Sequence, residues 1–247
     1  ADLADKYKVR EYVQSLGLGD TLVKLYGRWD KASDIDWDRL PNQFVLKVNN
    51  GCGDILICRD KDKLDKATVI DTYDRLVSIK YGDVTGEPHY ARIQPCVIAE
   101  ELLDINKQSI NTSSLIDYKV WCLNGKPYCI WCAWNRGKEG ADTGVYDLDW
   151  NYHPEGSVFT EHYRQGKEIL PKPKCFERML EVASKLSEEF PILRVDLYEV
   201  NEKIYFGELT FTSLGGFMDY LTSEILLDMG SKVRINEISE EYVHVKC

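Results

Sequence analysis

The sequence lacks the marks of several classes of protein. No uninterrupted apolar run reaches the roughly 18 residues of a membrane-spanning helix. The first residues contain no apolar stretch behind a basic head, so no secretory signal is expected. The chain opens on Ala1 and not on a methionine, which leaves room for preceding residues in a longer protein.

The chain has fewer basic than acidic side chains. The chain has 31 lysines and arginines against 41 aspartates and glutamates, a formal net charge of −10. A surface with this balance repels polyanions on average, which argues against nucleic acid as the main partner. The 247 residues are 44% hydrophobic, so we expect a packed core in one large domain or two small ones.

Several familiar catalytic motifs are missing. The sequence contains no P-loop pattern, no G-x-S-x-G elbow and no H-E-x-x-H zinc motif. Gly51 and Gly53 begin a G-x-G pattern, but Leu56 stands where the dinucleotide fingerprint needs its third glycine. The four histidines never fall at metal-ligand spacing. These absences argue against a P-loop nucleotidase, a dinucleotide-binding dehydrogenase, an α/β-hydrolase and a zinc protease.

The eight cysteines are even in number, but most lie in apolar, strand-like runs. Cys129 and Cys132 form a C-x-x-C pair without the second pair that a structural zinc site needs. A redox pair would open a helix, whereas this one lies inside a predicted strand. We therefore favour buried, reduced thiols over a zinc site or a disulfide framework, and we expect a cytoplasmic protein.

Hydrophobic periodicity predicts a mixed α+β chain built from hairpins. Helices are expected over residues 2–16, 63–79 and 176–190. The predicted strands are 44–48 with 55–59, 95–103, 115–123 with 126–134, and 192–200 with 203–211. The Asn124-Gly125 dipeptide predicts a type I′ turn. Loops are expected over 81–92, 104–114 and 137–144, and a glycine-rich and then helical tail begins at residue 213.

One element with chemical potential is the strand that carries Lys47. A turn rich in asparagine and glycine follows this strand at once, and its glycines allow positive φ and leave N–H groups exposed. Such a turn can bind phosphate oxygens through backbone amides while a lysine supplies the charge. The same residues also fit an edge-strand lysine beside an ordinary hairpin turn.

A second element is the late hairpin with Arg194, Asp196 and Glu208. Strand alternation places Arg194 and Asp196 on one face, and the return strand carries Glu208. Two carboxylates on neighbouring strands, completed by phosphate, form a ligand set that suits Mg²⁺. Cross-strand ion pairs on an exposed face are the alternative. The apolar neighbours predict a buried hairpin, where carboxylates need a partner or a metal, so we favour the metal interpretation.

The third element is an apolar strand that ends in Glu100 and Glu101, followed after a loop by Asp117. This strand offers apolar walls and backbone groups to a base, and Asp117 could accept hydrogen bonds from ribose hydroxyls. Taken by itself, the pattern favours the alternative, a buried strand that leaves the core through a solvated acidic turn without binding a ligand.

Together and in this order, the three elements resemble the ATP-grasp superfamily. The whole chain is similar to its TupA-like branch, which is linked to teichuronopeptide and other bacterial surface polysaccharide synthesis. The resemblance rests on DKYKVREYV (5–13), LPNQFVLKVNNGCGD (40–54), IAEELL (98–103), LIDYKVWCLNGKP (115–127), YDLDWN (146–151) and FPILRVDLYEVNEKIYFGELTF (190–211). It implies two α+β subdomains that clasp a nucleotide, with ATP and Mg²⁺ as cofactors.

The resemblance also implies roles for individual residues. For the nucleotide, the implied contacts are Arg10, Lys47, Asn50, Gly51, Gly53, Glu100, Glu101, Leu103 and Asp117. Arg194 would face the γ-phosphate, and Lys119 would point into the same site. Asp196 and Glu208 would ligate Mg²⁺. Thr210 stands where many relatives have an asparagine as third metal ligand, so it is the weakest member of the metal set.

The resemblance further implies a division of the chain. Residues 1–41 would form an N-terminal helical segment, 42–103 the first ATP-grasp subdomain and 104–247 the second. The N-terminal domain that usually precedes this fold has no counterpart in the sequence, so we expect it to be missing here.

The implied activity is an ATP-dependent carboxylate–amine ligase that forms an acyl phosphate and then an amide. Its partners would be a carboxylate-bearing small molecule or glycan and an amine donor, next to a membrane-associated polysaccharide assembly system. Two alternatives stay open: a glycan kinase of the same fold, and a glycosyltransferase that uses the D-x-D pair Asp147 and Asp149.

Overall fold

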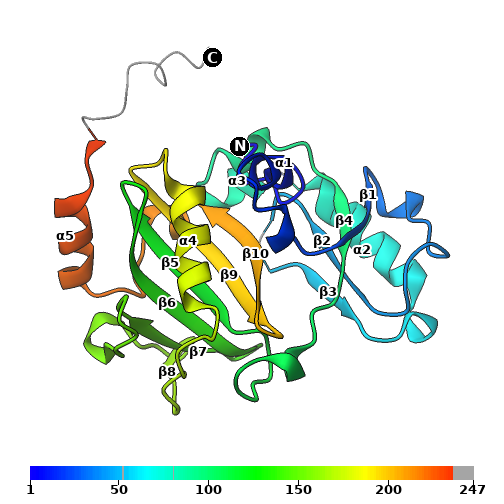
Figure 1. Cartoon of the computed structure of the whole chain (residues 1–247). Helices are drawn as coiled ribbons and strands as arrows, with labels where there is room; N and C mark the ends of the chain where they lie inside the picture. The colour runs from blue at the N-terminus through cyan, green and yellow to red at the C-terminus, as the bar shows by residue number, and fades with distance from the viewer. Residues whose placement is uncertain (52, 80, 236–247) are drawn as a thin grey trace. The chain divides into compact units, whose positions relative to one another are not determined.

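The structure is a computed structural model that describes residues 1–51, 53–79 and 81–235, without the side chains of Val84 and Thr85. It divides into two compact units (Figure 1). Unit 1 comprises residues 1–104 and 214–216, and unit 2 comprises residues 105–213 and the chain from 217 onward. The finer division into three parts at residues 41/42 and 103/104 stays a prediction.

Unit 1 contains a four-stranded antiparallel sheet in the order β1-β4-β2-β3. Its strands are β1 (Leu25–Trp29), β2 (Phe44–Val48), β3 (Ile55–Cys58) and β4 (Val97–Glu100). Helices α1 (Val9–Ser15), α2 (Lys66–Ser78) and α3 (Tyr81–Thr85) belong to the same unit. Alternate β2 residues Phe44, Leu46 and Val48 are buried and form a core with Val69 and Tyr73 of α2.

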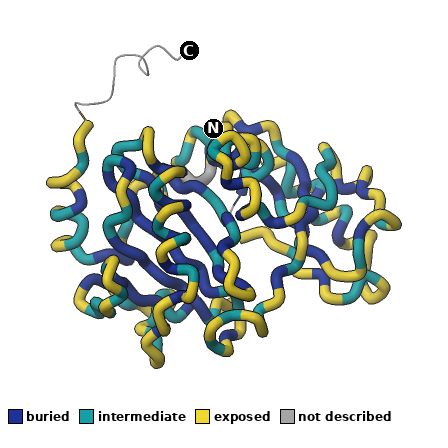
Figure 2. The backbone as a smooth tube through the Cα atoms, viewed as in Figure 1, coloured by how far each residue is buried: buried dark blue, intermediate teal, exposed yellow. Residues whose placement is uncertain are grey.

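Unit 2 contains a six-stranded sheet in the order β10-β9-β5-β6-β7-β8. Its strands are β5 (Asp117–Leu123), β6 (Lys126–Gly137), β7 (Gly140–Tyr146), β8 (Tyr163–Gln165), β9 (Ile192–Val200) and β10 (Lys203–Thr210). All neighbouring pairs are antiparallel except β7 and β8, which are parallel. Figure 2 shows that the middle strands are almost wholly buried.

Two helices of unit 2 pack against opposite faces of this sheet. The Cys122 thiol contacts the Ala183 carbonyl of α4 (Phe176–Ser187). Its neighbour Trp121, which points the other way along β5, shares a core cluster with Met229 of α5 (Ser223–Lys232). The two faces of β5 are therefore covered by different helices, which agrees with the burial of the whole strand.

The predicted hairpins are confirmed. Strands β2 and β3, β5 and β6, and β9 and β10 pair as expected. Asn124 and Gly125 both have positive φ, 49° and 75°, as a type I′ turn requires. Asn201 and Glu202 adopt the same conformation, with φ of 55° and 57°. The predicted strand 95–103 is present as the fully buried β4.

Other predictions were wrong in their bounds or type. Helix α1 begins only at Val9, because the buried Asp5 carboxylate accepts hydrogen bonds from the amides of Tyr7 and Lys8 and holds residues 2–8 in turns. Most of the predicted loop 137–144 is strand β7. It starts at Gly140, where φ is +118° and a Cβ atom would lie 2.1 Å from the His162 carbonyl oxygen. Strand β1 and helix α3 were not predicted.

The thiol interpretation agrees with the structure. Six cysteines lie among the described residues and all are free, five of them buried. Burial raises the pKa of Cys129 to about 12 and raises the pKa of Cys132 well above the ordinary thiol value, so neither is a reactive thiolate. Cys52 and Cys247 lie outside the described residues. No helix in the described ranges has the length and apolarity to cross a bilayer.

Candidate active site

In unit 1, Glu100 joins two of the predicted phosphate-binding cations. Lys47 on β2 and Glu100 on the adjacent β4 come within 2.6 Å, measured from Nζ to Oε2. Arg10 of α1 approaches the other carboxylate oxygen, with Nη1 3.2 Å from Oε1. The Glu100 side chain is only 8% exposed. The structure therefore brings Arg10, Lys47 and Glu100 together, with the Glu100 carboxylate bonded to both cations.

Hydrogen bonds with residues outside the turn after β2 hold that turn in place. The Asn49 side chain accepts from the Cys96 amide at 2.7 Å and donates to the Gln94 carbonyl at 3.1 Å. Lys6 donates from its backbone amide to the Asn49 carbonyl at 3.1 Å and from Nζ to the Gly51 carbonyl at 2.7 Å. These contacts fix the backbone of the predicted phosphate-binding turn. Lys6 was not predicted to take part.

The remaining predicted nucleotide contacts of unit 1 occupy different environments. Asn50 is buried in the turn, whereas Gly53 is exposed with φ of +88°. A non-glycine residue at that φ would be strained. Glu101 is exposed beyond the end of β4, and its amide donates to the Lys24 carbonyl at 2.9 Å. Leu103 is buried. No described contact tests their roles as ligands, which stay predictions.

In unit 2, Lys119 lies between two buried carboxylates. Its Nζ is 2.7 Å from Asp117 Oδ2 and 2.5 Å from Asp196 Oδ2. The second contact follows from strand pairing, because Lys119 of β5 is the register partner of Asp196 of β9. Burial disfavours the charged ammonium, but the two carboxylates outweigh burial and raise the Lys119 pKa. Lys119 therefore stays charged inside the unit.

Arg194 forms the other half of this cluster. Its Nε and Nη2 donate to the two oxygens of Asp196 at 2.7 Å and 2.9 Å, a bidentate pair. Nη2 also donates to Thr210 Oγ1 at 3.0 Å and lies 3.6 Å from Glu208 Oε1. The guanidinium therefore lies between the predicted metal ligands and contacts all three of them.

The position of Glu208 depends on a β-bulge at Gly207. Counting regular pairs back from the Asn201–Glu202 turn would place Gly207 opposite Asp196 and turn Glu208 to the other face. The register instead shifts between Phe206 and Glu208, so that Glu208 pairs with Asp196 and Thr210 with Arg194. A Cβ atom on Gly207 would lie 3.0 Å from the Asp196 carbonyl oxygen, which a glycine avoids. The bulge places Glu208 on the same face as Asp196.

The donor set around Asp196 fits a magnesium ion that is shared with phosphate. Within the described ranges, no three His, Cys, Asp or Glu side chains come close enough to hold a metal by themselves. Mg²⁺ is commonly held by one or two carboxylates, with phosphate and water completing its shell. Asp196 and Glu208 supply that pair of carboxylates, and the Glu208 side chain is 35% exposed and so open to an ion.

Asp117 has an unused acceptor in a buried place. Its Oδ2 bonds to Lys119 at 2.7 Å and to Arg136 Nη2 at 3.1 Å, but its Oδ1 finds no partner in the described part of the chain. Burial raises the Asp117 pKa. A buried acceptor without a donor costs free energy, so Asp117 is suited to a hydroxyl donor from a ligand. The predicted contact to ribose is compatible with this position and stays a prediction.

Two residues of the cluster were missed by the prediction. The Ser213 hydroxyl accepts from Arg194 Nη1 at 2.8 Å and shares a 2.8 Å hydrogen bond with the Tyr220 hydroxyl. Both residues are buried and orient the guanidinium from the side away from Asp196. They follow β10 in an irregular segment, where no strand alternation indicates which side chain turns inward.

The fold matches solved ligases. The D-alanine–D-alanine ligase from Bacillus anthracis superimposes with a TM-score of 0.56 at 15% identity, over 97% of this chain and 70% of the ligase chain. The same ligase in complex with ATP gives a TM-score of 0.54 at 15% identity, over 93% of this chain and 61% of the other. At such identity the likeness establishes the fold alone. A search of curated proteins gives no match.

A family model described as TupA-like ATP-grasp matches residues 1–234. The match includes both sheets, the Lys47–Glu100 pair and the Lys119–Asp196–Arg194 cluster. It agrees with the ligase-like fold of the two units. This chain therefore belongs to the TupA-like ATP-grasp family.

Proposed function

We propose that the protein is an ATP- and Mg²⁺-dependent ligase that joins a carboxylate to an amine. The observation that carries the proposal is the buried cluster of Lys119, Asp196 and Arg194 with Glu208 beside it, in a chain of an ATP-grasp family. The proposed setting is bacterial surface polysaccharide biosynthesis, with a glycan or small-molecule acid as acceptor. The family match supports this setting.

The proposed reaction has two steps. A carboxylate oxygen of the acceptor attacks the γ-phosphorus of ATP, and ADP leaves with the electron pair of the broken P–O bond. The amine then attacks the acyl carbon, loses a proton, and phosphate leaves. A bound Mg²⁺ would neutralise phosphate charge. Arg194 and Lys119 are buried, fixed cations that can stabilise negative charge as it develops during transfer.

Unit 1 is proposed to supply phosphate contacts through Lys47 and Arg10. In the structure both cations are bonded to Glu100, so the Glu100 carboxylate keeps the two side chains in place. Binding of phosphate oxygens would add to these bonds or replace them. Because Glu100 is buried, it cannot simply rotate into solvent, and we expect it to remain the anchor of Lys47.

The bonding of Asp147 does not favour the glycosyltransferase alternative. Its carboxylate accepts hydrogen bonds from the Asp149 amide and from the amide and side chain of Asn151. His153 Nε2 lies 3.2 Å from the same carboxylate. An aspartate engaged in this way stabilises a turn. The kinase alternative differs from the ligase in its product, because a kinase leaves the phosphoryl group on the acceptor.

The decisive experiment incubates the purified protein with Mg-ATP and pairs of candidate acids and amines. The expected result is release of ADP and phosphate together with a product whose mass equals acid plus amine minus water. A product that retains phosphate would show a kinase. The proposal is refuted if no pair of acid and amine leads to ADP release and the protein also does not bind ATP. The matched inactive variant is Glu208→Gln, which removes a charge at a partly exposed position.

A further inference from the structure

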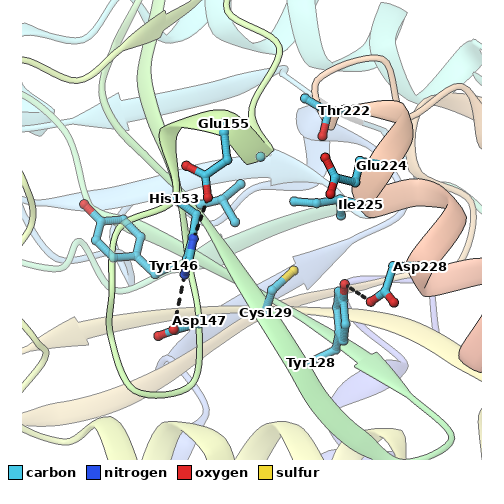
Figure 3. Close-up of a pocket in the computed structure, with 12 residues that line it drawn as sticks. Tyr128, Cys129, Tyr146, Asp147, His153, Glu155, Thr222, Glu224, Ile225 and Asp228 are labelled. Atoms are coloured by element: carbon cyan, nitrogen blue, oxygen red, sulfur yellow. Dashed lines mark hydrogen bonds and ion pairs between the residues drawn. The ribbon is translucent and has the colours of Figure 1, made fainter.

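Unit 2 contains a cavity that the proposed ligase site does not use. It has a volume of about 340 Å³ and lies where β6 and β7 meet the start of α5 (Figure 3). The lining residues are Tyr128, Cys129, Val145, Tyr146, Asp147, His153, Glu155, Gly156, Thr222, Glu224, Ile225 and Asp228. None of them belongs to the Lys119–Asp196–Arg194 cluster. Its volume falls in the range of small-molecule sites.

The cavity carries four carboxylates, two of which are joined by a histidine. His153 Nδ1 lies 2.7 Å from Glu155 Oε1 and its Nε2 lies 3.2 Å from Asp147 Oδ2, as Figure 3 shows. Asp228 accepts a hydrogen bond from the Tyr128 hydroxyl at 2.6 Å and an ion pair from Lys232. With His153 and Lys232 both charged, the four carboxylates still outnumber the cations by two.

Two acceptors on the α5 side have no partner in the described ranges. Glu224, in the first turn of α5, is exposed to solvent and makes neither a hydrogen bond nor an ion pair within those ranges. Thr222 is the N-cap of α5, yet its side chain makes no cap hydrogen bond, and its Oγ1 is buried without a partner. An N-cap threonine ordinarily gives this oxygen to a backbone amide. Figure 3 shows the Thr222 hydroxyl and the Glu224 carboxylate on the same side of the cavity.

The walls of the cavity indicate what kind of cation fits. Val145, Ile225 and Cys129 offer apolar surface, and Tyr146 adds an aromatic ring. The described residues contain no group of three metal-binding side chains close enough to hold an ion, although Asp147, His153 and Glu155 are neighbours. A bare divalent ion would also leave most of 340 Å³ and the apolar walls without a contact. A cation with a hydrocarbon body satisfies both the acceptors and the walls.

We propose that this cavity binds a small organic ammonium ion. Its ammonium group would donate hydrogen bonds to Glu224 and Thr222 Oγ1, and its hydrocarbon part would lie against Val145 and Ile225. A primary ammonium has three donors, so it could bond both to the exposed Glu224 carboxylate and to Thr222 Oγ1, which has no partner in the described ranges. The site is independent of the proposed ligase reaction, because it contains none of the residues assigned to ATP.

The test is calorimetric titration of the full chain at pH 7, without nucleotide, using n-pentylamine as the probe. Saturable binding of the amine and weaker binding of n-pentanol, which lacks the charge, are expected. Glu224→Gln should weaken amine binding about tenfold, the usual effect of losing a charge-assisted hydrogen bond. Thr222→Val, which removes the hydroxyl and keeps the shape, should weaken it about threefold.

The control is Glu161→Gln, an exposed carboxylate outside the cavity, which should leave binding unchanged. The proposal is overturned if pentanol binds as well as the amine, or if Glu224→Gln and Thr222→Val bind it like the unsubstituted protein. It is also overturned if the amine does not bind at all. Since ATP is absent, none of these outcomes depends on the ligase proposal, and an inactive ligase could still bind the amine.

Discussion

Glu208 lies directly opposite Asp196 across the β9–β10 pair, and the bulge at Gly207 is the reason. The two carboxylates nevertheless differ in their surroundings. Asp196 is buried between Arg194 and Lys119, while the Glu208 side chain is 35% exposed. Asp196 therefore holds the cluster together, whereas Glu208 is partly accessible from solvent. Because of this difference, we expect substitution of Asp196 and substitution of Glu208 to have different effects.

Asp196→Asn is expected to destabilise the protein. The change leaves the buried cations Lys119 and Arg194 with one fewer counter-charge, which costs about 3–5 kcal/mol when a buried pair is broken. Glu208→Gln, at a partly exposed position, is expected to cost less than about 1 kcal/mol. Urea unfolding of the two variants measures the difference. Equal free energies of unfolding would contradict the buried role of Asp196.

Glu208→Gln is expected to lower turnover in the proposed reaction about 100-fold or more, because an amide is a poorer ligand for Mg²⁺ than a carboxylate. The Mg²⁺ concentration at half-maximal rate should rise in parallel. Initial rates over a magnesium series measure both. Unchanged magnesium dependence in Glu208→Gln would show that Glu208 is not a metal ligand. The matched control is Glu202→Gln, on the exposed turn of the same hairpin.

Lys47→Met is expected to weaken ATP binding about tenfold or more, because the variant keeps the side-chain length and loses the charge. The β2–β4 pairing should persist, since the backbone hydrogen bonds remain. Titration with a fluorescent ATP analogue measures the affinity. Lys63→Met is the control, because Lys63 is exposed and forms its ion pair with the nearby Asp60. Equal affinities for the two variants would exclude Lys47 as a phosphate ligand.

His153 is expected to titrate above its ordinary pKa of 6.5. The hydrogen bond to Glu155, followed by that to Asp147, favours the imidazolium and raises the His153 pKa. The stabilisation is complete below pH 6.5 and is lost as the pH rises through the higher folded-state pKa. An NMR titration of the imidazole measures it. Glu155→Gln should lower the His153 pKa, and an unchanged value would show that the Glu155 contact is absent in solution.

Tyr73→Phe is expected to lower stability by about 1–3 kcal/mol, because its hydroxyl bridges two strands inside the core. It donates to the Leu46 carbonyl and accepts from the Leu56 amide, both at 2.9 Å. Burial raises the pKa of Tyr73 to about 12, so the hydroxyl stays protonated as a donor. Thermal unfolding measures the loss. Tyr152→Phe removes one exposed 3.3 Å contact and should change stability by less than about 0.5 kcal/mol.

Much of the strand framework could be predicted because it depends on local signals. Alternating apolar residues and turn dipeptides such as Asn124-Gly125 fix which segments pair and in what order. Strand β7 could not be predicted, since small residues such as Gly140, Ala141 and Gly144 give little apolar alternation. Its position depends on close backbone packing against His162, which only the folded unit provides.

The sequence indicated several residues that the structure brings together, but it did not indicate how they are bonded; their roles as ligands stay predictions. The types and spacing of Lys47, Arg194 and Asp196 indicate phosphate and metal chemistry, but not that Glu100 or Asp196 joins two cations. Those bonds depend on which strands are neighbours and on one bulge, and neither follows from spacing along the chain. Ser213 and Tyr220 lie in irregular structure, where side-chain direction has no period.

The two hydrogen bonds from Lys6 to the turn after β2 have a practical consequence for limited proteolysis. The Nζ bond to Gly51 spans 45 positions of sequence. A cut shortly after Lys6 would separate that anchor from α1 while leaving every residue of the turn intact. Protease sensitivity of the opening segment, compared with and without Mg-ATP, would therefore report on the turn after β2, although the cut itself lies outside that turn.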